Sequence, residues 1–245
     1  MNLILDSGNS FTKLYIFAED RIVLSQTFEK LELNILEKIF NEHPIEASIY
    51  SHVGNLNIEV QNFLQSHSHY IAFNQHTPVP IKNNYKTPET LGLDRLAAVC
   101  GAYKILPHTN VLCIDMGTCV TYDFINADGT YLGGAISPGI NMRYKAMHTF
   151  TSALPLFDSQ HPQKAKLIGA NTEESMRSGA MNGYQFEIMG FIDAYQKNYP
   201  NLHVLICGGD TALLDTQLKN SIFVRADLVA EGLNTILNYN VQKKN

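Results

Sequence analysis

Two stretches of the chain share one pattern of apolar and polar positions. The first runs from Asn2 to Ile16 and the second from Val111 to Ile125. Each reads as an apolar strand, an Asp-x-Gly turn and a second apolar stretch. A constant offset aligns Asp6 with Asp115, Gly8 with Gly117, Thr12 with Thr121, Ile16 with Ile125, and Glu19-Asp20 with Asp128-Gly129. A match that extends over strand, turn, strand and second turn indicates an internal duplication.

The remainder of each half alternates between helical and strand periodicity. In the first half we expect a helix over 31–40, a strand over 47–53, a helix over 56–66, a strand over 70–73, a long loop over 75–90 and a helix that begins near Asp94. In the second half we expect a strand over 131–136, a helix that starts at Ser137-Pro138-Gly139, a long helix from Asn171 to about Asn198, a strand over 203–207, a helix over 213–218, a strand over 222–224 and a closing helix over 228–240. Hairpin strands followed by alternating helix and strand predict a mixed sheet with helices on its faces. The sequence therefore predicts an α/β fold of two duplicated domains, residues 1–107 and 108–245.

Composition and charge narrow the class of partner. Of 245 residues, 45% are hydrophobic and 17% are charged, which is an ordinary globular balance. The formal net charge of -5 argues against nucleic acid and against anionic membrane, because both reward clustered Lys and Arg. The four cysteines form no C-x-x-C pair, and the first residues lack the pattern of a signal peptide. We therefore expect reduced thiols and a cytoplasmic protein.

Asp6 and Asp115 each end an apolar strand just before a glycine turn. Such turns expose backbone N–H groups that suit phosphate oxygens. A carboxylate beside a phosphate is favourable when a hard cation such as Mg²⁺ lies between them. The following strands bring hydroxyl and cationic side chains to the same places: Ser10, Thr12 and Lys13 in the first copy, Thr118 and Thr121 in the second. The alternative is that each Asp-x-Gly is only a hairpin turn, although two matched copies with similar flanks favour a phosphate site.

A third candidate site is the segment Gly92-Leu93-Asp94-Arg95. Asp94 can accept a proton from a substrate hydroxyl, and the Arg95 guanidinium can bind a carboxylate or amide oxygen. The alternative is that Asp94 caps a helix and Arg95 faces solvent. The glycine pairs Gly133-Gly134 and Gly208-Gly209 follow strands and precede helices. They fit close approach to a ligand, and tight strand-to-helix packing explains them equally well.

Taken in order, these motifs resemble the type III pantothenate kinases, which belong to the actin, Hsp70 and sugar-kinase superfamily. The resemblance rests on Asp6-x-Gly8, Gly92-x-Asp94-Arg95, Asp115-x-Gly117-Thr118, Gly133-Gly134-x-Ile136-x-Pro138-Gly139 and Gly208-Gly209-Asp210. It covers nearly the whole chain, and Gly-x-Asp-Arg between the two Asp-x-Gly motifs is its specific part. It implies two ribonuclease-H-like domains with a cleft between them, and the phosphorylation of pantothenate by ATP at the start of coenzyme A biosynthesis.

The resemblance also implies roles for particular residues. Asp94 would be the catalytic base, and Asp115 would bind a monovalent cation, K⁺ or NH₄⁺, beside the Mg²⁺ that accompanies ATP. The residues expected to bind ATP are Asp6, Ser7, Gly8, Asn9, Ser10, Phe11, Thr12, Lys13 and Thr118. The residues expected to bind pantothenate are Tyr85, Gly92, Leu93, Asp94, Arg95 and Thr172. Cys119 and Cys207 depart from the family pattern, where Ala and Thr or Ser are expected, so the detailed nucleotide contacts stay open.

Oligomeric state and rival functions follow from the same residues. The long helix carries Phe186, Ile188, Met189 and Phe191 in its middle, more apolar surface than one half is expected to bury, which predicts a homodimer. One rival function is a kinase for another small hydroxyl compound. A second is a non-catalytic accessory protein on the same fold, which loss of Asp6, Asp94 or Asp115 would favour; none of the three is lost.

Overall fold

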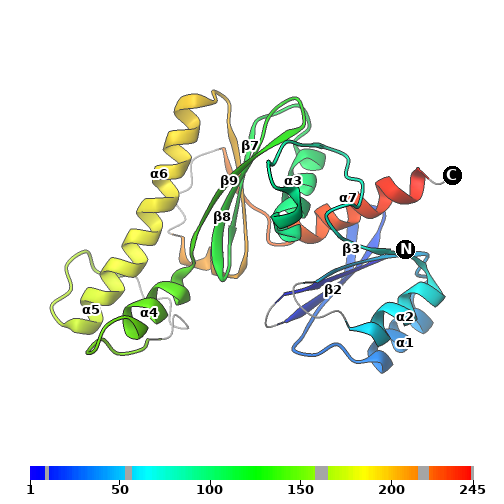
Figure 1. The fold of residues 1–245 in the computed structure, drawn as a ribbon, viewed down its shortest axis with the longest axis horizontal. Helices are drawn as coiled ribbons and strands as arrows, with labels where there is room; N and C mark the ends of the chain where they lie inside the picture. Colours follow the sequence, from blue (N-terminus) through cyan, green and yellow to red (C-terminus); the bar gives the residue numbers. More distant parts are fainter. Residues whose placement is uncertain (9–10, 53–56, 158–164, 215–220, 244–245) are drawn as a thin grey trace. The chain divides into compact units, whose positions relative to one another are not determined.

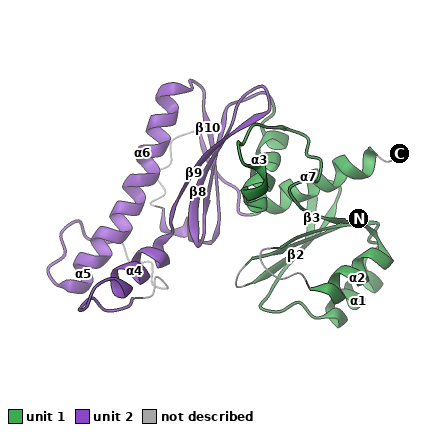
Figure 2. Ribbon diagram, in the orientation of Figure 1, with its two compact units in different colours: residues 1–107, 227–245 green, residues 108–226 purple. Residues whose placement is uncertain are grey.

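The fold was analysed in a computed structural model, which describes residues 1–8, 11–52, 57–157, 165–214 and 221–243 (Figure 1). The chain divides into two compact units (Figure 2). Unit 1 consists of Met1–Pro107 with Asp227–Asn245, and unit 2 consists of His108–Ala226. In the described residues no helix is both long and apolar enough to cross a membrane.

Unit 1 is built on a five-stranded mixed sheet with the order β3-β2-β1-β4-β5. Its strands are β1 (Asn2–Ser7), β2 (Thr12–Ala18), β3 (Arg21–Phe28), β4 (Ala47–His52) and β5 (His69–Ala72). Strand β1 pairs antiparallel with β2 and parallel with β4, so it lies at the centre of the sheet. The segment expected to be a long loop holds only β6 (Lys82–Asn83) and a 3₁₀ turn, Pro88–Thr90.

Helices cover both faces of this sheet. Helices α1 (Leu33–Glu42) and α2 (Ile58–His67) share an apolar core with Leu3 and Leu5 of β1. Helix α7 (Leu228–Gln242) contacts β1 and β4, and α3 (Leu93–Ile105) packs along α7. Because side chains alternate along a strand, Asn2, Ile4 and Asp6 share the face opposite to Leu3 and Leu5. Asn2 confirms this by donating to Asn234 Oδ1 at 2.7 Å and to Asn238 Oδ1 at 2.8 Å, both on α7.

Unit 2 repeats the same strand arrangement. Its strands are β7 (Val111–Met116), β8 (Cys119–Ile125), β9 (Thr130–Pro138), β10 (His203–Cys207) and β11 (Ile222–Val224). Within the unit their order is β9-β8-β7-β10-β11, with β7 antiparallel to β8 and parallel to β10. This is the order of unit 1, so the predicted duplication is present in the fold.

The helices of unit 2 follow the strands closely. They are α4 (Ile140–Thr149), α5 (Thr172–Arg177), a π-helical turn (Ser178–Asn182) and α6 (Gly183–Asn198), followed after β10 by a 3₁₀ helix, Gly209–Leu213. Helix α6 covers β8, where Phe191 stacks on Tyr122 with ring centroids 4.0 Å apart. The predicted helix over 213–218 lies mostly outside the described residues.

The closing helix differs from the expected domain division. The second domain was expected to run to residue 245, whereas residues 227–245 group with unit 1. Helix α7 crosses α3 closely at two glycines: a methyl group on Gly232 would lie 1.8 Å from the Ala97 carbonyl oxygen. Only glycine permits this approach of two helix backbones, and the bonds from Asn2 hold the same helix. Periodicity along the chain contains no signal for which sheet a terminal helix will cover.

Three other expectations differ from the structure. Ser137 and Pro138 end strand β9, and the helix cap is Gly139, so the expected Ser cap with Pro in the first turn is wrong. The constant offset between the two halves also fails at the first hairpin, where Ser7 pairs with Thr12 while Met116 pairs with Val120. The first turn is therefore one residue longer than the second.

The long helix also buries more of its apolar middle than expected. Ile188 is fully buried, and Met189 and Phe191 pack against the core of unit 2. Phe186 alone of the four is exposed, with 64% of its surface accessible. The premise that this stretch exceeds what its own unit buries is wrong for three of the four residues.

Candidate active site

The first Asp-x-Gly turn lies at the carboxyl end of β1 in unit 1. The Gly8 N–H donates to the Phe11 carbonyl at 3.0 Å, which closes the turn. The Ser7 and Thr12 hydroxyls are 2.7 Å apart, and Lys13 pairs opposite Asp6 in the sheet. Of the residues expected to bind ATP, Asn9 and Ser10 lie outside the described residues. Those described between Asp6 and Lys13 lie in the β1–β2 hairpin and place hydroxyl, ammonium and carboxylate groups at the carboxyl end of β1, whereas Thr118 lies in unit 2.

Asp6 and Asp94 come close enough for their charges to interact. Burial, first, and the Asp94 carboxylate, second, raise the pKa of Asp6 from 3.8 to about 6, and Lys13 opposes them. Strand alternation explains this, because Asp6 shares the face of β1 that α7 covers, and α3, which carries Asp94, packs along α7. A cation at Asp6 would relieve the cost of its charge, so the site fits a metal-bound phosphate.

The segment Gly92–Arg95 begins helix α3. Gly92, and not Asp94, is the cap residue, and Asp94 lies exposed in the first turn with its Oδ1 accepting from the Arg95 N–H at 2.8 Å. A methyl group on Gly92 would lie 2.6 Å from this Asp94 Oδ1. Glycine at position 92 therefore makes room for the carboxylate of Asp94 in its present place. The alternative in which Asp94 caps the helix is therefore wrong, because the cap residue is Gly92.

Arg95 and Tyr85 also come together in unit 1. The Arg95 side chain points into the unit, with only 6% of the residue accessible. Its guanidinium lies over the Tyr85 ring, 5.6 Å from the centroid. The alternative in which Arg95 faces solvent is therefore wrong. The Tyr85 ring thus holds the Arg95 guanidinium in place at the start of the helix that carries Asp94.

The second Asp-x-Gly turn lies at the carboxyl end of β7 in unit 2. Asp115 pairs opposite Thr121, and the Gly117 N–H donates to the Cys119 carbonyl at 3.0 Å. The Thr118 carbonyl accepts from the Gly139 N–H at 3.1 Å, so the turn is held against the start of α4. The turn after β10 is also close, since a methyl group on Gly208 would lie 2.5 Å from Asp115 Oδ1.

Thr172 lies on a different element of unit 2, helix α5. It is exposed in the first turn of α5, where Asn171 Oδ1 accepts from the Glu174 N–H at 2.8 Å. This cap matches the expected helix start. Within the units, the structure thus brings together Asp6 with Asp94 and Tyr85 with Arg95.

Two charged residues near the second turn were not predicted from the sequence. Arg143 of α4 and Glu187 of α6 form an ion pair whose side chains are 20% and 23% accessible. Glu187 stands inside the apolar run 186–192, and a lone carboxylate in such a run was the available signal.

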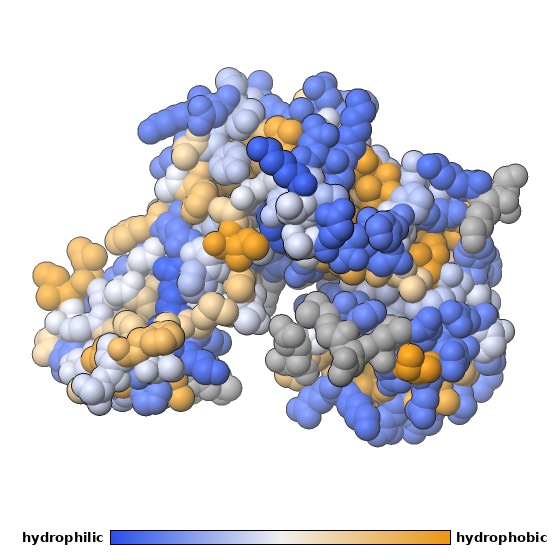
Figure 3. Space-filling view, viewed as in Figure 1, coloured by the Kyte–Doolittle hydropathy of each residue, from blue (hydrophilic) through white to orange (hydrophobic). Residues whose placement is uncertain are grey.

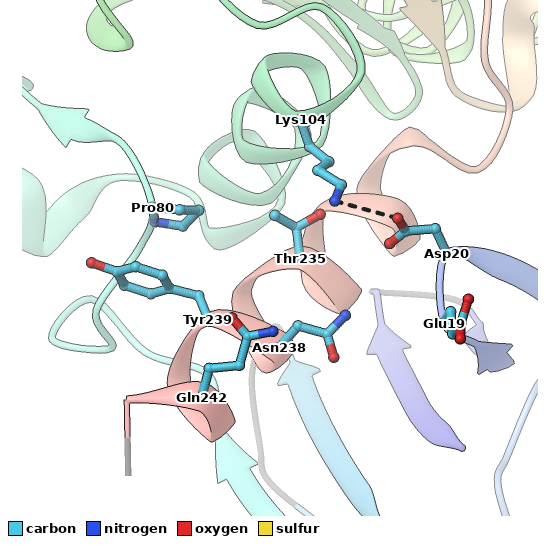
Figure 4. A pocket seen from close by; sticks show the side chains of 8 residues that line it. All are labelled: Glu19, Asp20, Pro80, Lys104, Thr235, Asn238, Tyr239 and Gln242. Atoms are coloured by element: carbon cyan, nitrogen blue, oxygen red, sulfur yellow. Dashed lines mark ion pairs between the residues drawn. The ribbon is translucent and has the colours of Figure 1, made fainter. Parts of the chain in front are cut away.

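A separate polar cavity of about 430 Å³ lies at the other end of unit 1. Figure 4 shows Lys104, Asn238 and Tyr239 around it, together with the ion pair of Lys104 with Asp20 at 3.3 Å. The cavity adjoins the β2–β3 turn, which lies beside Asn2 at the start of β1. It is therefore at the opposite end of the strand from Asp6.

Comparison with known proteins identifies the family. The model of the type III pantothenate kinase family matches residues 2–194. A type III pantothenate kinase of Phocaeicola vulgatus is 44% identical over 98% of this chain and 99% of its own. One of Christiangramia forsetii is 42% identical over 98% and 99%. The chain belongs to the type III pantothenate kinase family.

Solved structures agree on the fold of this family member. A Baf family protein from Campylobacter jejuni has a TM-score of 0.62 at 22% identity, covering 98% of this chain and 99% of its own. A glucokinase from an Antarctic psychrotroph has a TM-score of 0.52 at 14% identity, covering 97% and 98%. At these identities the likeness shows the fold alone, which is the expected pair of ribonuclease-H-like domains with mixed sheets.

The raised pKa of Asp6 gives a prediction about stability. Since the pKa is higher in the folded chain than in the unfolded one, ionisation of Asp6 lowers stability as the pH rises from 3.8 to about 6. Asp6→Asn removes that ionisation and should raise the free energy of unfolding at pH 7 by about 1–3 kcal/mol. The gain should vanish near pH 3, where both chains are neutral at this position.

Thermal unfolding at both pH values measures this effect. Asp128→Asn is the matched control, because Asp128 is an exposed carboxylate in a hairpin turn and its loss should change little. An Asp6→Asn variant that is less stable than wild type at pH 7 would contradict the electrostatic description.

Proposed function

We propose that this chain transfers a phosphoryl group from ATP to the primary hydroxyl of pantothenate, the first step of coenzyme A biosynthesis. The family match over residues 2–194 carries the proposal. The placement of Asp94 in an exposed position beside Asp6 supports it, because phosphoryl transfer needs one base near the phosphate site.

Each group of residues has a proposed part in this reaction. Asp94 takes the proton of the pantothenate hydroxyl as that oxygen attacks the γ-phosphorus and the β–γ bond breaks, releasing ADP. Tyr85, Gly92, Leu93, Arg95 and Thr172 bind pantothenate, and the Arg95 guanidinium, oriented by Tyr85, binds its polar oxygens. The hairpin Asp6–Lys13 and Thr118 bind ATP.

Cations complete the proposed site. Mg²⁺ that accompanies ATP would supply positive charge beside the phosphate oxygens, and the Asp6 carboxylate, whose pKa is raised by burial, is suited to hold it. Asp115 is proposed to bind K⁺ or NH₄⁺, since it lies near the carboxyl end of β7, two residues before Gly117 of the turn. Thr118 and the backbone of that turn would then face the nucleotide.

We also propose a homodimer. Figure 3 shows apolar side chains gathered on the part of unit 2 that carries α4 and α5. The exposed apolar residues of this part include Phe150, Leu156, Leu167 and Ile168, which are 85%, 60%, 72% and 82% accessible. Surface of this kind on one end of a unit supports an interface. A monomer in sedimentation that retains full activity would rule out a functional dimer.

The substrate assignment is tested by ADP release over a panel of hydroxy acids and sugars. Pantothenate should give the highest rate, with K⁺ or NH₄⁺ supporting more activity than Na⁺. A sugar that elicits ADP release where pantothenate does not would move the chain to another kinase activity. No ADP release with any acceptor would favour an accessory protein on the same fold.

The role of Asp94 is tested by two neighbouring variants. Asp94→Asn should lower kcat by about 10²–10⁴ and leave ATP binding nearly unchanged, because the amide cannot take a proton. Gly92→Ala should lower kcat at least tenfold. The methyl group of alanine would displace the Asp94 carboxylate, because its carbon would lie 2.6 Å from Asp94 Oδ1.

Gly92→Ala also separates catalysis from folding. Gly92 has φ -58° and ψ 130°, which alanine adopts without strain, so the melting temperature should stay within a few degrees of wild type. Unchanged kcat in both variants would remove Asp94 from the mechanism.

A further inference from the structure

Arg143 and Glu187 form an ion pair in unit 2 that carries several further hydrogen bonds, and no part of the proposed reaction uses them. Arg143 Nη2 lies 2.5 Å from Glu187 Oε2. Glu187 also accepts from the Tyr122 hydroxyl at 2.9 Å and from the Ser137 hydroxyl at 3.1 Å. Burial raises the pKa of Glu187, but hydrogen bonds from Arg143, Tyr122 and Ser137 outweigh it and hold the pKa below 4.5. The carboxylate is therefore charged and well satisfied at neutral pH.

Arg143 uses its other donors on the end of strand β9. Its Nε donates to the Pro138 carbonyl at 2.9 Å, and Nη2 donates to the Ser137 hydroxyl at 3.2 Å. Its guanidinium lies over the Tyr184 ring, 5.1 Å from the centroid. The guanidinium group of Arg143, with its several N–H donors, thus joins the last two residues of β9 to helix α6.

The end of β9 in turn holds the second Asp-x-Gly turn. Pro138 pairs opposite Cys119 in the sheet, and Ser137 pairs opposite Val120. The next residue, Gly139, donates its N–H to the Thr118 carbonyl at 3.1 Å. A continuous series of hydrogen bonds and chain neighbours therefore runs from Glu187 through Arg143, Pro138 and Gly139 to Thr118.

We propose that Arg143 and Glu187 are positioning residues for the nucleotide: they fix the end of β9 and thereby the Gly117–Thr118 turn. This deepens the proposed function and rests on it, because that function places ATP at this turn. Helix α6 is a firm anchor, since Ile188, beside Glu187, is fully buried and Tyr122 also stacks on Phe191. The proposed reaction assigns neither residue a contact with the reacting groups.

A purely structural ion pair would behave differently. Loss of such a pair lowers stability and affects both substrates alike. Loss of a pair that positions one turn should weaken the binding of ATP and leave the binding of pantothenate nearly unchanged. The groups proposed to bind pantothenate lie on other elements. The ratio of the two KM values therefore distinguishes the two roles.

The test compares Glu187→Gln with Arg143→Lys. Glu187→Gln should raise KM for ATP about tenfold, the effect of one weakened charge-assisted hydrogen bond, with KM for pantothenate within about twofold of wild type. Arg143→Lys keeps a positive charge beside Glu187 but loses the planar guanidinium and its several donors. Its KM for ATP should lie between those of wild type and Glu187→Gln.

The matched control is Glu42→Gln. It removes the exposed Lys38–Glu42 pair of α1, whose charges are 3.8 Å apart with side chains 72% and 55% accessible. Both KM values should stay unchanged in this control. Equal rises in both KM values, or a lower melting temperature with unchanged KM for ATP, would overturn the positioning role. Should Glu187→Gln fail to fold, the milder Arg143→Lys decides the question on the same readouts.

A second readout does not depend on pantothenate. Amide exchange at Gly139, whose N–H is held by Thr118, should be faster in Glu187→Gln than in wild type, and the dissociation constant of a non-hydrolysable ATP analogue should rise about tenfold. If wild type does not phosphorylate pantothenate, the proposed function fails while these two measurements still decide the positioning role. Unchanged exchange and unchanged analogue binding would overturn it.

Discussion

The charge interaction between Asp6 and Asp94 is the constraint on which unit 1 depends. Burial and the nearby Asp94 carboxylate both raise the pKa of Asp6, so the ionised form of Asp6 is costly in the folded chain. The fold sustains this arrangement because α3 is held along α7 by the close glycine crossing, while α7 is bound to the start of β1 by Asn234 and Asn238. An unfavourable free energy at a functional site is commonly balanced by packing elsewhere in the protein. Here the packing that balances it is the crossing of α3 and α7.

In unit 2 the equivalent turn is held in place by different interactions. The strand end beside its turn after β7 is held by an arginine–glutamate pair and by backbone hydrogen bonds. The two turns are equivalent in topology, yet one lies beside repelling charges and the other beside a satisfied ionic network. A duplicated scaffold has thus acquired two distinct chemical environments at matching strand ends.

Most of the fold was predictable because the strands are short, apolar and bounded by turn residues. Strand β10 was expected over 203–207 and is found at His203–Cys207, and the closing helix, expected over 228–240, is found at Leu228–Gln242. The misses have physical causes. Ser137-Pro138 looked like a helix start because these residues favour that position, but pairing with β8 extends the strand through them. Sheet pairing is a long-range effect that local pattern does not contain.

The site divides in the same way. The local positions of Asp6, Asp94 and Asp115 were predictable, because a carboxylate near a glycine turn or a helix start is a local signal. The Arg143–Glu187 pair was not, since its partners are 44 residues apart in sequence and meet only when α4 and α6 pack on one sheet. Orientation of Arg95 likewise needed the structure, because only packing decides whether a helix-start arginine turns inward to Tyr85.

The return of α7 to the first sheet has a consequence for how the chain is made. Residues 108–226 leave the ribosome before Asp227–Asn245, so unit 2 is complete in sequence while unit 1 still lacks the helix that covers β1 and β4. Domains generally fold as units during synthesis. Unit 2, although second in the chain, is the first that can finish folding, and the nascent face of the N-terminal sheet stays uncovered until the last helix emerges.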